Sequence, residues 1–273
     1  MCLILFAWKM HENFPLVFAA NRDEFYERPS APADFWEDAP EILAGRDLRE
    51  GGTWLGITRA GRFAALTNYR DPASLKIGAP SRGRLVSDYL RGREIPEAYL
   101  NRIKHDADRF NGFSLFVGDP AGLFYFSNRG ALQRLKPGIY GLSNRLLDTP
   151  WPKVERGKTA LLALLKGKKG LSPETLFALL TDRTRPPDDR LPDTGVGLTW
   201  ERILSPLFIE SPVYGTRSST VLLIDRRGGV TFVERVFNGA ADPRMTARFD
   251  FRIGQAGDGD RRCGEPAVPI TSW

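Results

Sequence analysis

The chain opens with two apolar runs separated by a polar turn. Residues 3–8 and 16–21 are mostly apolar, and the residues between them, KMHENFP, are mostly polar. Continuously apolar runs of this length fit strands that are covered on both faces, and the turn between them predicts a hairpin. Residues 25–50, which carry prolines and charges, are expected to form a loop.

Further along the chain, turn residues and helical spacing alternate. Hairpins are expected around Ala60–Gly61, around Asp119-Pro120-Ala121-Gly122 and around Arg227-Gly228-Gly229. One more strand is expected at GIYGLSN. Apolar positions spaced near 3.6 residues predict helices over 82–110, 151–167 and 172–183, the last with Ser172 as N-cap, and a long loop over 184–200.

The order of these elements is strands, helices, strands, helices, strands. Runs of strands separated from runs of helices favour antiparallel sheets with segregated helices, which is an α+β layered fold. We expect one domain over residues 1–253. Residues 254–273 are rich in glycine and charge and poor in apolar residues, and we expect them to form a loosely ordered tail.

Composition narrows the chemistry. The chain of 273 residues has two cysteines, Cys2 and Cys263, and two histidines, His11 and His105, none of them at metal-ligand spacing. No metal and no cofactor is therefore expected. No apolar run is long enough to span a bilayer, and the first run lacks the basic start of a signal peptide, so we expect a cytoplasmic protein.

The net charge of +6 is mild and spread along the chain. It suits a solvated surface or a small anionic ligand, and aromatic residues do not interleave with it as a nucleic-acid module requires. The segment SRGRL, residues 81–85, opens a predicted helix with two arginines and could hold an anion.

Cys2 follows Met1 directly, and methionine removal tolerates a small second residue. Processing would give Cys2 a free α-amino group with an ordinary pKa of about 7.7–8.0, beside a thiol with a pKa near 8.5. One residue could then supply both nucleophile and base, which allows hydrolysis without histidine. The alternative is a small buried residue in a core strand.

Polar residues end several of the apolar strands. Asn21, Arg22, Asp23 and Glu24 end the second strand, which pairs with the start of the first if the two form a hairpin, so Asp23 could hold the terminal amine. Asn68 and Asn144 end two other strands, where a carboxamide could stabilise an oxyanion by about 3–4 kcal/mol. Arg217 could bind a substrate carboxylate or pair with an acid. Each could instead be a strand-end or turn residue.

Six motifs together resemble a known family. The MC start, AANRDE, GRD followed by GGTWLG, the TN dipeptide, YGLSN…LDTPWPK and GTRSST are similar to the NRDE family, whose eukaryotic members are called transport and Golgi organisation proteins. The resemblance covers roughly residues 1–240. It implies an N-terminal nucleophile hydrolase-like fold, a four-layer αββα sandwich of two antiparallel sheets between helical layers.

The resemblance also implies roles for single residues. In cysteine-type acylases of the wider superfamily, the nucleophile matches Cys2 and the acid near the amine matches Asp23. The oxyanion asparagines match Asn68 and Asn144, and a late arginine matches Arg217. Those acylases carry an arginine three residues before the aspartate, where this chain has Ala20, with Arg22 on the other side.

Two functions follow from these residues and from the resemblance. The first is an N-terminal cysteine hydrolase of an amide or thioester in a small acylated substrate, such as an acyl-CoA, with Asn21, Arg22 and Glu24 binding substrate. The second is a non-catalytic carrier for haem, acyl-CoA or another lipid ligand, as implied by the family's association with haem and acyl-CoA homeostasis. Both predict a small-molecule ligand that is anionic or acylated.

Overall fold

A computed structural model describes residues 2–167, 170–240 and 242–254. The strands are β1 (Cys2–Trp8), β2 (Leu16–Phe25), β3 (Ser30–Trp36), β4 (Ala39–Asp47), β5 (Leu55–Thr58), β6 (Phe63–Asn68), β7 (Phe113–Asp119), β8 (Gly122–Ser127), β9 (Gln133–Arg134), β10 (Gly138–Leu142), β11 (Tyr214–Ile224), β12 (Gly229–Val236) and β13 (Met245–Arg252). The helices are α1 (Gly83–Arg91), α2 (Pro96–Asp106), α3 (Pro152–Lys166), α4 (Pro173–Leu180) and α5 (Leu198–Leu204).

The first sheet is built around the predicted β1–β2 hairpin. Its strand order is β10-β1-β2-β11-β12-β13, and the neighbouring strands are antiparallel. Side chains alternate along each strand, so Phe6 and Phe18 face the second sheet while Leu5 and Val17 face the helices. Both faces are thus covered, which explains why these strands are apolar throughout.

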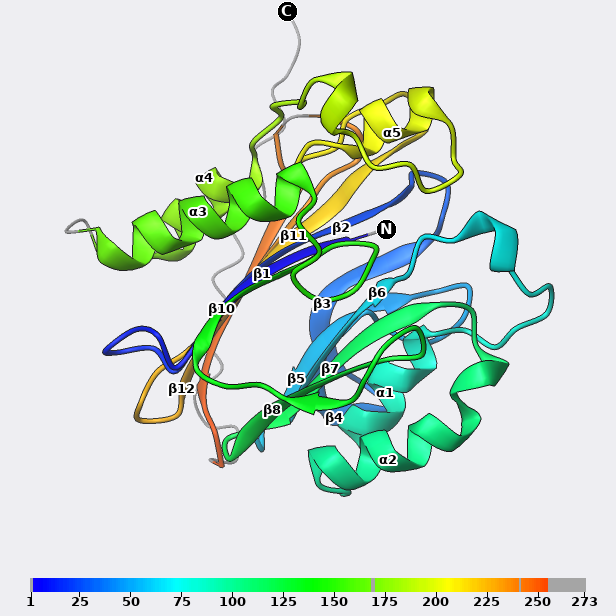
Figure 1. Ribbon diagram of the computed structural model, residues 1–273. Helices are drawn as coiled ribbons and strands as arrows, with labels where there is room; N and C mark the ends of the chain where they lie inside the picture. Colours follow the sequence, from blue (N-terminus) through cyan, green and yellow to red (C-terminus); the bar gives the residue numbers. More distant parts are fainter. Residues whose placement is uncertain (1, 168–169, 241, 255–273) are drawn as a thin grey trace, which may run out of the picture.

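The second sheet has the order β3-β4-β5-β6-β7-β8-β9 and is also antiparallel. Its inner face packs against the first sheet, and its outer face packs on α1 and α2. Figure 1 shows the resulting layers, with α3 and α4 across the first sheet and α1 and α2 against the second. The predicted four-layer αββα arrangement is therefore confirmed.

The prediction of a loop over residues 25–50 is wrong, because this segment forms the β3–β4 hairpin. The prolines and charges of this segment indicated a loop, but they are compatible with this hairpin. β3 is an edge strand whose register with β4 shifts twice, and such strands tolerate Pro32 and half-exposed side chains. The loop predicted over 184–200 likewise ends early, since α5 begins at Leu198. The predicted helix over 172–183 is confirmed with its Ser172 cap, whose side chain accepts a hydrogen bond from the Thr175 backbone N–H at 3.3 Å.

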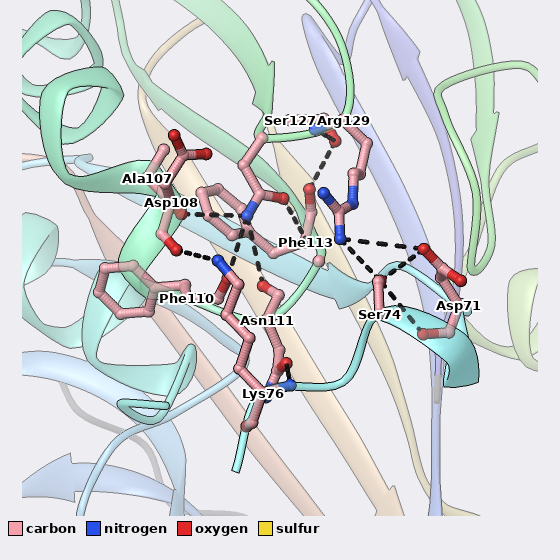
Figure 2. Close-up of polar contacts among 12 residues, drawn as sticks. Asp71, Ser74, Lys76, Ala107, Asp108, Phe110, Asn111, Phe113, Ser127 and Arg129 are labelled. Carbon is pink, nitrogen blue, oxygen red and sulfur yellow. Dashed lines mark hydrogen bonds and ion pairs between the residues drawn. The ribbon is translucent and has the colours of Figure 1, made fainter. Parts of the chain in front are cut away.

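A polar network fixes the connection between β6 and α1, which Figure 2 shows in part. Arg129 donates to the Ser74 hydroxyl at 2.7 Å, and that hydroxyl donates to the Asp71 carboxylate at 2.5 Å. Lys76 and Asn111 exchange hydrogen bonds of 2.7 and 3.2 Å, and the Lys76 ammonium donates to the Asp108 carbonyl. These contacts tie residues 71–76 to residues 108–129.

The longest described helix, α3, has 15 residues. In the described part of the chain, no helix combines the length and apolar character needed to cross a membrane. Of the predicted C-terminal tail, only Gly254 is described, and Cys263 lies outside the described residues.

Candidate functional site

A cavity of about 610 Å³ lies where β1 begins and where β2 and β6 end. Most of the residues singled out in the sequence line it: Cys2, Arg22, Asp23, Glu24, Asn68 and Arg217. These residues come from both sheets, and they are far apart in the sequence. The hairpin register and the polar ends of the strands bring them together.

The Cys2 thiol stands at the wall of this cavity with only 7% of the residue exposed. Cys2 pairs with Arg22, and Arg22 with Ser218, so the three side chains share the inner face of the first sheet. Burial raises the pKa of the Cys2 thiol to about 11, and the charge of Asp23 adds to the rise. The charge of the terminal amine opposes the rise most, ahead of Arg22 and the Asp23 backbone N–H. At neutral pH the buried thiol is therefore protonated and needs a proton acceptor to react.

Asp23 is fully buried beside Cys2. Its Oδ1 accepts a hydrogen bond of 2.8 Å from the Thr216 hydroxyl, and its backbone carbonyl accepts one of 2.9 Å from the Tyr214 hydroxyl. Burial raises the pKa of Asp23, and the charge of Lys153 and the bond from Thr216 act against that rise. β11, whose Thr216 lies opposite Asp23 in the sheet, therefore holds this carboxylate in place near the end of β2.

Three further charges are buried in the same part of the molecule, and two of them, Lys153 and Arg70, act on the charge of Asp23. Lys153, in the first turn of α3, is 3% exposed, and its ammonium donates to the Leu204 carbonyl at 2.8 Å. Arg70 and Glu201 form an ion pair of 2.7 Å with side chains 5% and 4% exposed. We call Asp23, Arg70, Lys153 and Glu201 the buried charge cluster. Burial lowers the pKa of Lys153 to about 8, although the charge of Asp23 opposes the change.

Two arginines bring positive charge to Cys2, one from β2 and one from the start of α1. Arg22 comes from β2, and within the described residues its side chain makes no hydrogen bond or ion pair. Arg82, at the start of α1, donates to the Gly112 carbonyl at 3.1 Å, and its charge interacts with those of Glu24 and Cys2. A guanidinium carries five donors, so both side chains have donors left for an anionic ligand.

Glu234 contributes a buried carboxyl group to the same cavity. Its Oε1 accepts a hydrogen bond of 2.7 Å from the Ala33 backbone N–H, which joins β12 of the first sheet to β3 of the second. Burial raises the pKa of Glu234, while Ala33 and the charge of Arg22 oppose the rise. Glu234 therefore links the two sheets at the wall of the cavity.

The structure places Asn21 away from the cavity, contrary to its expected role in substrate binding. Its amide donates to the carbonyls of Leu180 and Leu207 at 3.0 and 2.9 Å, and its Oδ1 accepts from the Ser219 hydroxyl at 2.6 Å. Asn21 lies on the opposite face of β2 from Arg22, because neighbouring side chains alternate. Its side chain is thus used to anchor the helical layer to the sheet.

The two asparagines that were predicted to stabilise an oxyanion lie in contact with each other, but only one of them lines the cavity. Asn68 lines the cavity, and within the described residues its side chain has no hydrogen-bond partner. Asn144 is fully buried beneath it and donates to the Asn68 backbone carbonyl at 2.9 Å. Arg217 lines the cavity while its Nη1 donates to the carbonyls of Phe25, Tyr26 and Arg28 at 2.8–3.1 Å. Asn68 therefore offers a donor to the cavity, whereas Asn144 and Arg217 brace its walls.

The sequence analysis did not single out Lys153, Arg70, Glu201 and Glu234. For two of them, Lys153 and Glu234, the sequence pattern does indicate a special position. A cation in the first turn of a helix opposes the helix dipole, so Lys153 at that place indicates a specific partner. Glu234 shares the inward alternation of Val230 and Phe232, which indicates a carboxyl group inside the core. Arg70 and Glu201 lie in segments with no periodic pattern.

The sequence comparison assigns the family. The model of the family described as Transport and Golgi organisation 2 matches residues 1–239. The chain belongs to this family. A human Transport and Golgi organization protein 2 homolog is 39% identical over 86% of this chain and 92% of its own length. The bovine homolog is 38% identical over 93% and 99%, and the fruit-fly protein is 32% identical over 88% and 93%. The resemblance seen in the six motifs is thus confirmed.

Two solved structures are similar to this member of the Transport and Golgi organisation 2 family. A Caenorhabditis elegans ortholog of N-acylethanolamine-hydrolyzing acid amidase has a TM-score of 0.47 at 12% identity, over 81% of this chain and 92% of that one. The C2A mutant of a conjugated bile acid hydrolase from Clostridium perfringens has a TM-score of 0.44 at 10% identity, over 98% and 97%.

Proposed function

We propose that this protein is an N-terminal cysteine hydrolase that cleaves an amide or thioester bond in a small, anionic, acylated substrate. The observation that carries the proposal is the position of Cys2. It begins the first strand at the wall of a large cavity, beside Arg22, with the Asn68 carboxamide facing the same space. The family motifs that contain these residues support the same assignment.

The proposed reaction begins with removal of Met1, which gives Cys2 a free amine. The amine takes the thiol proton as sulfur attacks the acyl carbonyl carbon, and Asn68 donates to the developing oxyanion. Collapse of this intermediate breaks the bond to nitrogen or sulfur, and the amine returns its proton to the leaving group. Water then attacks the acyl-cysteine with the amine as base, which releases the acid and restores the thiol.

The substrate class follows from the charges around Cys2. Arg22 on β2 and Arg82 at the start of α1 both line the cavity and keep donors available, and a guanidinium fork matches a carboxylate or phosphate. An acyl donor that carries such a group fits best. In an N-acyl amino acid the carboxylate lies next to the scissile amide, whereas in an acyl-CoA ester the phosphates lie at the far end of the pantetheine arm.

The test is hydrolysis of N-acyl amino acids and acyl-CoA esters, measured alongside the intact mass of the purified protein. We expect a mass without Met1, turnover by the native protein and no turnover by Cys2→Ala. Cys263→Ala is the matched control and should retain full activity. Equal turnover by Cys2→Ala would overturn the mechanism. Tight binding of acyl-CoA or haem without turnover would instead favour a carrier.

A further inference from the structure

A continuous row of side chains crosses the first sheet along the floor of the large cavity. Each residue of the row lies opposite the next on the neighbouring strand, in the order Cys2, Arg22, Ser218, Val236 and Met245. All five residues line the cavity. Neighbouring strands lie about 4.8 Å apart, so Val236 is about 14 Å and Met245 about 19 Å from Cys2. The cavity therefore extends across the sheet from β1 to β13.

The chemistry of the floor changes along this row. A guanidinium and a hydroxyl follow the thiol, whereas the far end consists of Val236, which is half-buried, and Met245, which is 37% exposed. Sites for small molecules combine apolar surface with a few polar groups that fix the orientation of the ligand. Methionine is flexible and polarisable, which suits contact with a chain of variable length. The row therefore offers a polar end at the thiol and an apolar end at β12 and β13.

The second sheet covers the apolar end through β3, which contacts both β12 and β13. Glu234, two residues before Val236, accepts the hydrogen bond of 2.7 Å from the Ala33 backbone N–H. Ala31 and Pro32, which precede Ala33, line the cavity as well. The apolar end thus has a floor on the first sheet and a wall on the second, and a buried hydrogen bond joins the two.

We propose that Val236 and Met245 form an apolar subsite, which binds the remote end of an aliphatic acyl chain whose polar end lies at Cys2. The assignment rests on the proposed function, which puts the acyl carbonyl at the thiol. A ligand that extends from Cys2 to the far end of the row passes Arg22 first, so its anionic group lies near the thiol and its tail lies on the subsite. A dodecanoyl chain reaches the subsite and an acetyl group does not, so the two residues select substrates by chain length.

The test is the binding of N-acetylglycine and N-dodecanoylglycine, measured by isothermal titration calorimetry. The full chain carries Cys2→Ala, so that neither ligand is consumed. Burying only two methylene groups raises affinity by about tenfold, so N-dodecanoylglycine should bind at least about tenfold more tightly than N-acetylglycine. Val236→Thr combined with Met245→Gln keeps the shapes of the side chains and makes them polar. This advantage should then fall by about threefold or more, with the affinity for N-acetylglycine unchanged.

The matched control is Val213→Thr combined with Met10→Gln. It makes the same two changes at side chains that are 59% and 47% exposed and lie outside the cavity lining, and it should leave both affinities unchanged. If the double variant at the subsite does not fold, Met245→Gln alone decides, because Met245 is partly exposed at the start of β13. A smaller advantage of the dodecanoyl ligand in that single variant supports the subsite.

Two results would overturn the proposal. One is equal affinity of the Cys2→Ala protein for the two ligands, and the other is an advantage of N-dodecanoylglycine that the substitutions at Val236 and Met245 leave unchanged. Failure of the proposed function is seen separately, as equal turnover by Cys2→Ala.

Discussion

The buried ion pair of Arg70 and Glu201 gives the sharpest prediction of stability. Glu201→Gln keeps the size of the side chain. It also keeps an oxygen that can accept the hydrogen bond from the Thr194 backbone N–H, which is 2.9 Å long in the native protein. It replaces the oxygen that accepts from Arg70 at 2.7 Å by an amide NH2, so the charge and this hydrogen bond are lost together at a place nearly without solvent. The variant therefore measures the cost of a buried guanidinium that has lost its carboxylate partner.

Breaking a buried pair by removing one partner costs about 3–5 kcal/mol. For a chain of this size each kcal/mol lowers the melting temperature by about 2–4 °C, so we expect a fall of roughly 6–20 °C. The assay is thermal unfolding followed by circular dichroism at neutral pH. Arg70→Met combined with Glu201→Gln removes both charges and should recover much of the loss.

Arg202→Gln is the matched control on the same helix. Arg202 is paired with Asp188, but the two side chains are 49% and 51% exposed, so the loss should stay below about 1 kcal/mol. If Glu201→Gln lowers the melting temperature no more than Arg202→Gln does, the buried pair is not a stability determinant and this reasoning is refuted.

Three other predictions follow from single residues. Asn68→Ala should lower kcat by about 10²–10³-fold with little change in KM, measured on any substrate that the protein hydrolyses, and an unchanged kcat would exclude Asn68 as the oxyanion donor. Burial raises the pKa of Glu234, so the unfolded chain loses this proton at a lower pH than the folded protein does, and the native protein loses stability as pH rises from about 4.5 to 7. Glu234→Gln lacks this proton, so its free energy of unfolding should rise relative to that of the native protein over the same range. A difference between the two free energies that does not change with pH would contradict this. Gly157→Ala should cost about 1–3 kcal/mol in urea unfolding, since its Cβ would lie 2.5 Å from Leu5 Cδ1, whereas no loss would show that α3 can move aside.

The sequence predicted those parts of the fold that depend on short-range patterns. The β1–β2 hairpin, the helices α1 to α4 and the Ser172 cap all follow from periodicity and turn chemistry over a few residues. β3 and β4 were missed because an edge hairpin with two register shifts does not need apolar alternation. Their position depends on pairing with β5 and on contacts with the first sheet, which no local pattern contains.

In the site, too, the sequence predicted what depends on local patterns and missed what depends on contacts between distant segments. Cys2, Asp23 and Asn68 could be singled out because each lies at the end of an apolar strand. The partners of Asp23 could not, since Lys153 and Thr216 lie 130 and more residues away and meet it only after α3 and β11 dock on β1 and β2. Asn21 was misplaced for a simple reason: one position along β2 moves a side chain to the opposite face.

The cavity has one wall on each sheet, and two hydrogen bonds, one buried and one partly buried, join the two walls. One runs from Asn144 to Asn68, and the other from Ala33 to Glu234. In consequence, sulfur and its facing carboxamide keep their spacing only while the sheets do not slide past each other. For the proposed hydrolase, substitutions in the distant core between the sheets, such as at Phe6 or Phe116, should then lower turnover before they unfold the protein, so that lost turnover in a folded variant reports slippage between the layers.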